Sequence, residues 1–182
     1  LNPIEMITRL DRSGQCALTY ATNSSSGAPP PLLLDYFLRY LLGKIRANSL
    51  NTECFKLLVE QCVLQSAVNA SLPCVQYMCD FVAEIGSSSS SFGLAINVDA
   101  VCVLKGESAL TVACLNGHRA VCELLVERLH CSLLTVNSKS WTPLLCAVKS
   151  GCWEIVEYLL ASSERRGGRG GGPIIDQVDR HG

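Results

Sequence analysis

The chain has 182 residues, with 15 basic and 16 acidic side chains and a formal net charge of −1. Charges balanced in this way give no electrostatic footprint for nucleic acid or for an anionic membrane surface. Hydrophobic residues make up 48% of the sequence, yet we find neither a signal peptide nor a segment that would span a membrane.

The first predicted elements are two helices near the amino terminus. Residues 11–21 read Asp-Arg-Ser-Gly-Gln-Cys-Ala-Leu-Thr-Tyr-Ala, a turn followed by a short helix. Residues 31–42 predict a second helix, because apolar side chains recur at helical spacing and Asp35 and Arg39 exclude a membrane span. Between the two, residues 23–30 are rich in Ser, Gly and Pro and lengthen the connection.

A second, degenerate helix pair is predicted over residues 55–69 and 73–85, joined near Ser71. Ala21, Ala67 and Ala113 are 46 residues apart, so each interval holds one repeat plus about a dozen inserted residues. We place the insertions at residues 24–31 together with 43–51, and at the serine run 87–91. Residues 92–98 after that run fit either a hairpin finger or a buried extended strand.

The clearest pattern occurs twice, 34 residues apart, at residues 106–118 and in a copy that begins at Thr142. Ser108 and Thr142 are placed to cap a helix, and Pro143 fits the first helical position. Ala113 and Ala147 are small enough for neighbouring helices to approach, and Gly117 and Gly151 suit a left-handed helix end. A second apolar helix follows in each copy, so the sequence predicts stacked helix pairs.

The sequence repeats at a 34-residue interval and contains the motif D-x-x-G-x-T-P-L-H-x-A in partial form. In both respects it resembles an ankyrin array. We therefore expect an all-α ankyrin-repeat solenoid of helix pairs with β-hairpin-like fingers and long insertions, forming one array over residues 1–182. The approximate repeats are residues 11–51, 52–104, 105–137 and 138–178, and the next repeat opens at Asp179 with Asp-Arg-His-Gly. The array is expected to be truncated at both ends and to be a monomeric segment of a larger chain.

Eleven cysteines are present, and six of them fall on predicted apolar helix faces: Cys16, Cys62, Cys79, Cys114, Cys122 and Cys146. A reduced thiol is a small hydrophobe, so we interpret these as core residues rather than as disulfides. Cys114, His118 and Cys122 follow at four-residue steps, but Gly117 breaks that helix and no C-x-x-C pair accompanies them. We expect no metal and no cofactor.

No sequence motif for catalysis is found: G-x-S-x-G, a phosphate loop and H-E-x-x-H are all missing, so we expect no enzymatic activity. Residues 165–172 contain two Arg-Gly-Gly units, which in other proteins contact RNA. Without interleaved aromatic residues, the segment is better explained as a flexible insertion, and we expect no nucleic-acid partner.

Within the ankyrin class, the chain resembles the early repeats of the TANC and rolling pebbles scaffolds. The resemblance lies in the order of its motifs at Gly14 to Leu18, Gly106 to Thr111, Val121 to Leu125 and Pro143 to Leu160, and in Trp153. That resemblance implies a cytoplasmic scaffold at cell junctions or postsynaptic sites. Such a scaffold links membrane or junctional proteins to the cytoskeleton and to signalling partners.

Finger tips and a concave surface are where a helix-pair stack binds other proteins. The candidate contacts there are Lys105, Glu107, Lys139, Trp141 and Lys149. Trp141 is either a binding hot spot or packed against the neighbouring finger, whereas Trp153 is expected to pack within the fold. Two alternatives stay open: substrate recognition for a ubiquitin ligase, and RNA binding through the Arg-Gly-Gly segment.

Overall fold

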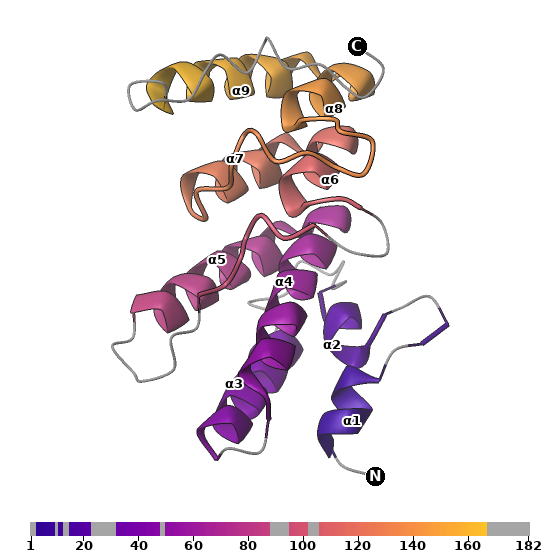
Figure 1. Ribbon diagram of the computed structural model, residues 1–182, viewed down its shortest axis with the longest axis vertical. Helices are drawn as coiled ribbons and strands as arrows, with labels where there is room; N and C mark the ends of the chain where they lie inside the picture. Colours follow the sequence, from indigo (N-terminus) through magenta and orange to yellow (C-terminus); the bar gives the residue numbers. More distant parts are fainter. Residues whose placement is uncertain are drawn as a thin grey trace. The chain divides into compact units, whose positions relative to one another are not determined.

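The computed structural model describes residues 3–9, 11–12, 15–22, 32–47, 50–87, 95–101 and 106–166, and every regular element in this part of the chain is an α-helix. The chain divides into two compact units, residues 1–97 and 98–182. The first holds α1 (Pro3–Thr8), α2 (Ala17–Tyr20), α3 (Leu32–Arg46), α4 (Thr52–Val68) and α5 (Leu72–Ser87) (Figure 1). The second holds α6 (Ala109–Leu115), α7 (Arg119–Glu127), α8 (Pro143–Ser150) and α9 (Trp153–Arg166). The predicted all-α repeat fold is confirmed.

In the first unit, α4 is the central helix, since α2, α3 and α5 all pack on it. It begins at Asn51, whose side chain accepts a hydrogen bond from the Glu53 amide at 2.9 Å. Phe55, Val59 and Cys62 on this helix are fully buried. The predicted pairing of residues 55–69 with 73–85 is therefore confirmed, with each helix one to three residues longer at its amino end and α5 two residues longer at its carboxyl end.

One expectation for the first unit was wrong. Gly43 was assigned to an insertion, but it lies within α3, which continues to Arg46. The reason is that Ile45 extends the buried face of this helix, where Leu34, Leu38 and Leu41 also lie. In addition, α1 precedes the first predicted element and packs on α2.

A polar bridge joins α3 to α5. The Tyr77 hydroxyl donates to Asp35 Oδ1 at 2.7 Å, and Arg39 Nε donates to the same oxygen at 2.7 Å. The hydrogen bond from Tyr77 is the main cause of a lowered pKa for Asp35, while burial raises the pKa of Tyr77. Because Arg39 and Asp35 are partly exposed, this bridge orients the helices more than it stabilises them.

In the second unit, the caps form as expected. Ser108 Oγ accepts from the Thr111 amide and Thr142 Oγ1 from the Leu145 amide, each at 3.3 Å, and Pro143 opens α8. Gly117 and Gly151 follow α6 and α8 with φ of 74° and 72°. These turns let α7 fold back beside α6, and α9 beside α8.

The two helix pairs of the second unit stack on each other: α6 packs on α8, and α7 packs on α9 (Figure 1). Ala113 and Ala147 are fully buried, as the close approach of these helices requires. Cys114, Leu125 and Ile155 are also buried and contribute to the core of this unit.

The insertions differ in part from expectation. Residues 95–98 form neither a strand nor a hairpin, since 95–97 are irregular and a turn follows at Val98 and Asp99; residues 92–94 lie outside the described part. Arg165 and Arg166 belong to α9 rather than to a flexible loop, while 167–172 are not described. Arg165 bonds to Ala161 and Ser162 of the same helix, and Arg166 bonds to the carbonyls of Val126 and Cys131.

We predict that Gly117→Ala destabilises the protein more than Gly151→Ala. Both positions have a positive φ, which costs a side chain about 1 kcal/mol. A Cβ at Gly117 would also lie 2.7 Å from Cys152 Sγ, whereas at Gly151 it meets nothing within 4 Å. The contact adds about 1 kcal/mol at Gly117. Urea unfolding of both variants measures the difference, and equal midpoints would contradict the close approach.

Candidate functional site

Two fingers project from the second unit. The first finger is residues 98–107, of which 98–101 and 106–107 are described, and the second finger is residues 131–142. The second rests on the first: the Ser132 amide donates to Asp99 Oδ1 at 2.8 Å, and the Ser138 amide donates to the Gly106 carbonyl at 2.7 Å. These two bonds join the described parts of the two fingers.

Asn137 holds the tip of the second finger in shape. Its side chain is 4% exposed, and its Oδ1 accepts from the amides of Lys139 and Trp141, each at 2.9 Å. Its Nδ2 donates to both carboxylate oxygens of Glu107 at 3.2 Å. Ser140 takes a positive φ of 61° within this turn. One buried amide thus fixes the turn and ties it to the first finger.

A cation and an indole lie together at this tip. Lys139 is exposed, and its Nζ lies 4.9 Å from the centre of the half-buried Trp141 ring. This is a cation–π contact, which restrains both side chains before any partner arrives. The structure therefore presents Lys139 and Trp141 as one preformed patch.

The other predicted contact residues are placed differently. Glu107 is half-buried, and besides Asn137 its carboxylate accepts from Thr111 Oγ1 at 3.0 Å, so it positions the tip from below. Burial and the charge of Glu107 raise the pKa of the nearby Cys146 thiol to about 12. Lys149 is exposed in the last turn of α8. Lys105 lies outside the described residues.

Trp153 was expected to pack within the fold, and that expectation was wrong: it is 67% exposed. The buried positions of α9 include Ile155 and Leu159, four residues apart, and a residue two before Ile155 points to the opposite side of the helix. Residue type suggested packing, but the helical period gives the correct face.

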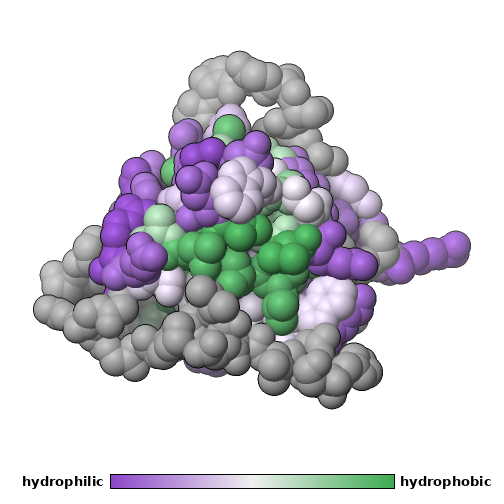
Figure 2. All heavy atoms as spheres, turned by 90° about the horizontal axis from the view of Figure 1, so that it is seen from above, coloured by the Kyte–Doolittle hydropathy of each residue, from purple (hydrophilic) through white to green (hydrophobic). Residues whose placement is uncertain are grey.

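An open apolar face lies on α8 and α9. It consists of Leu145, Val148, Val156 and Leu160, of which Val148 is 59% exposed and the others are half-buried. Figure 2, which looks onto this end of the second unit, shows hydrophobic side chains gathered here. The residues 34 positions earlier, Thr111, Cys114, Cys122 and Val126, are all buried. This is the same face of the preceding helix pair, where α8 and α9 pack.

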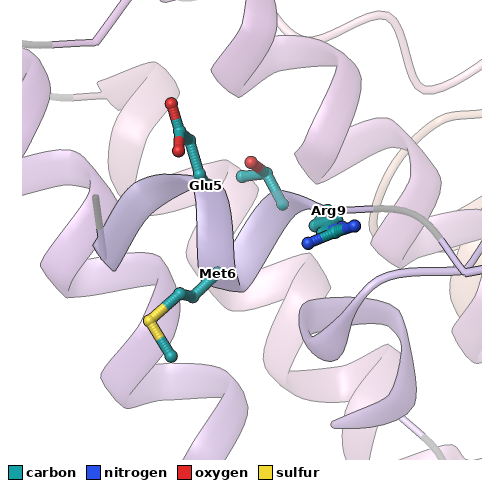
Figure 3. A pocket seen from close by; sticks show the side chains of 4 residues that line it. Glu5, Met6 and Arg9 are labelled. Carbon is teal, nitrogen blue, oxygen red and sulfur yellow. The ribbon is translucent and has the colours of Figure 1, made fainter. Parts of the chain in front are cut away.

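Two hollows lie beside described residues. One of about 380 Å³ lies beside α1, and its described lining is Glu5, Met6, Thr8 and Arg9. Figure 3 shows Glu5 and Met6 pointing to opposite sides of the helix, so these side chains do not converge on a bound group.

The other hollow, of about 260 Å³, lies between the end of α7 and α9. The two arginines that line it are already hydrogen-bonded within the protein. Arg165 donates to Ser162 Oγ at 2.9 Å, and Arg166 donates to the carbonyls of Cys131, at 2.8 Å, and Val126. A guanidinium at the carboxyl end of α7 complements the helix dipole, so this cluster holds the fold together.

The six cysteines predicted to be core residues are buried. Cys114 Sγ and Cys122 Sγ lie 3.7 Å apart, and this hydrogen bond, with burial, raises the pKa of Cys114. Such thiols are poor nucleophiles. Within the described ranges, no three His, Cys, Asp or Glu side chains are grouped so that they could hold a metal ion.

Stacked helix pairs joined by projecting fingers define a helical-repeat protein. Residues 67–166 match the family of ankyrin repeats, in three copies. Since the match covers more than half of the sequence, the chain belongs to the ankyrin-repeat family. Ankyrin repeats are protein–protein interaction modules and are typically non-catalytic. A search of curated proteins returned no match.

Among the helices that the structure describes, none is both long and apolar enough to cross a membrane. The individual repeat boundaries, including a first copy at residues 11–51, stay a prediction.

Proposed function

We propose that this chain is a non-catalytic scaffold segment whose second finger receives a protein partner. The observation that carries the proposal is the preformed tip, where Asn137 fixes the turn and Lys139 lies over Trp141. A rigid aromatic beside a cation loses little conformational entropy on binding, and Trp is a frequent hot-spot residue. Lys105 and Lys149 are proposed to extend this contact, with Glu107 holding the tip in place.

The cellular role follows from the resemblance to the TANC and rolling pebbles scaffolds. We infer a cytoplasmic adaptor at cell junctions or postsynaptic sites, where it would connect membrane or junctional proteins with the cytoskeleton and signalling partners. The sequence motifs at Gly106 to Thr111 and Pro143 to Leu160 support this inference.

The test is a pull-down with the purified chain, followed by measurement of affinity for the recovered partner. We expect Trp141→Ala to weaken binding at least about tenfold, as loss of a hot-spot side chain does. Trp153→Ala is the matched control, since this tryptophan is exposed, whereas Trp141 is half-buried, and belongs to α9. It should leave the affinity unchanged.

Deletion of residues 167–172 and treatment with RNase distinguish the scaffold function from RNA binding through the Arg-Gly-Gly segment. The deletion begins after Arg166, so it preserves the bonds that this side chain makes. Binding is expected to survive both. If the deletion or RNase abolishes capture of the partner while Trp141→Ala has no effect, the proposed scaffold function is wrong. The Arg-Gly-Gly segment is then the functional element. Circular dichroism should show that every variant keeps its helical content.

A further inference from the structure

Two thiols face each other inside the second unit. Cys114 belongs to α6 and Cys122 to α7, two helices that pack on each other (Figure 1). Both side chains are fully buried, and their Sγ atoms lie 3.7 Å apart. A disulfide bond is about 2.05 Å long, so each sulfur needs to move by only about 0.8 Å to reach bonding distance. A modest rotation of the two side chains supplies that movement.

The backbone between the two thiols is a tight turn between short helices. Gly117 turns the chain with a φ of 74°, and the His118 amide donates to the Ala113 carbonyl at 2.9 Å. The loop that a bond would close, residues 114–122, therefore already has its ends together. Because α6 has seven residues and α7 nine, neither helix is stable alone, and the pair opens when its packing is lost.

Burial decides when these thiols react. The hydrogen bond with Cys122, together with burial, raises the pKa of Cys114, and the thiolate is the form that attacks a disulfide. A reagent therefore reaches the two sulfurs when the α6–α7 pair opens. The first sulfur to be modified then has the second beside it, so closure of a ring between them competes well with every slower reaction.

We propose that Cys114 and Cys122 form an oxidative modification site, at which a low-molecular-weight disulfide produces an intramolecular Cys114–Cys122 bond. One thiolate attacks the reagent RSSR, forms a mixed disulfide and releases one RS⁻. The other thiolate attacks the protein sulfur of that mixed disulfide, forms the protein disulfide and releases the second RS⁻. The two thiol protons end on the released thiolates. The protein thiols thus lose two electrons, and RSSR is reduced to two RSH.

The bond changes how the second unit opens. It ties α6 to α7 and removes conformational freedom from the unfolded chain, so the oxidised unit should be the more stable form. Both sulfurs are buried in the folded unit, so a reductant reaches the bond only through an opening that the bond itself makes rarer. The oxidised state should therefore outlast the oxidant. This modification does not rest on the proposed function of the second finger.

The test is incubation of the reduced, purified chain with oxidised glutathione, followed by peptide mapping without reductant. We expect Cys114 to be linked to Cys122, and the exposed Cys54 to carry glutathione, which shows that the reagent is active. The melting temperature of the oxidised chain should exceed that of Cys114→Ser treated in the same way by about 5 °C. Dithiothreitol should remove glutathione from Cys54 before it breaks the bond between the buried sulfurs.

Cys146→Ser is the matched control, because Cys146 is another fully buried thiol of the second unit. It should leave formation of the bond unchanged, whereas Cys122→Ser should abolish it. Glutathione retained on Cys114 or Cys122 without a bond between them would overturn the proposal. So would a bond from either of them to Cys146 or Cys152, or two reduced thiols after long incubation just below the melting temperature. The mapping of the parent chain alone decides among these outcomes, even if a serine variant does not fold.

Discussion

Ala147→Asp is expected to unfold the α8–α9 pair. Ala147 is fully buried in α8, which packs on both α6 and α9. A carboxylate there would be desolvated and unpaired, at a cost of about 3–5 kcal/mol. The melting temperature should fall by about 10 °C or more, and amides of residues 143–166 should lose their protection against exchange.

The control is Val148→Asp, one residue further along the same helix. Val148 is 59% exposed, so the same carboxylate stays hydrated and should cost less than about 1 kcal/mol. If Ala147→Asp melted within about two degrees of the parent, the stacking of α8 against α6 would be contradicted.

The second large effect is expected for Asn137→Ala. This change removes two bonds to backbone amides and the pair to Glu107, and leaves the half-buried Glu107 carboxylate with one fewer donor. We expect a loss of about 2–4 kcal/mol in the free energy of unfolding, together with loss of the tip conformation. Urea unfolding and the near-ultraviolet signal of Trp141 measure the two consequences.

Asn137→Asp and Ser138→Ala refine that experiment. Aspartate keeps the acceptor for the two amides but sets a second carboxylate beside Glu107, so it should recover part of the stability and recover more as the pH falls. Ser138→Ala removes only an exposed hydroxyl and should have little effect. A stable, parent-like Asn137→Ala protein would show that the finger does not depend on this side chain.

The helix pairs of the second unit could be predicted from the sequence because their boundaries are set locally. Ser108 and Thr142 cap helices by accepting from amides three positions away, and Pro143 fits the first helical position without a bond of its own. Gly117 and Gly151 end the helices by their own φ. Such interactions depend on no distant residue, so a pattern in one stretch of sequence suffices.

The first unit was harder to predict because its helix ends depend on tertiary burial. A glycine inside a helix costs about 1 kcal/mol, and at Gly43 the burial of Ile45 outweighs that cost. In the site, the pairing of Lys139 with Trp141 is visible from their spacing, but the central role of Asn137 was missed. Its sequence signal was an Asn that precedes a turn by one position, a frequent side-chain bond to the backbone.

The cysteine thiols also give the chain a built-in set of chemical reporters. Cys54 is exposed, whereas Cys62 in α4, Cys74 in α5 and Cys114 in α6 are buried. A thiol-reactive dye would label Cys54 at once, and each buried cysteine only when its helix opens to solvent. The labelling rates, resolved by peptide mass, would therefore rank the helices by how often they open, with no substitution introduced into the protein.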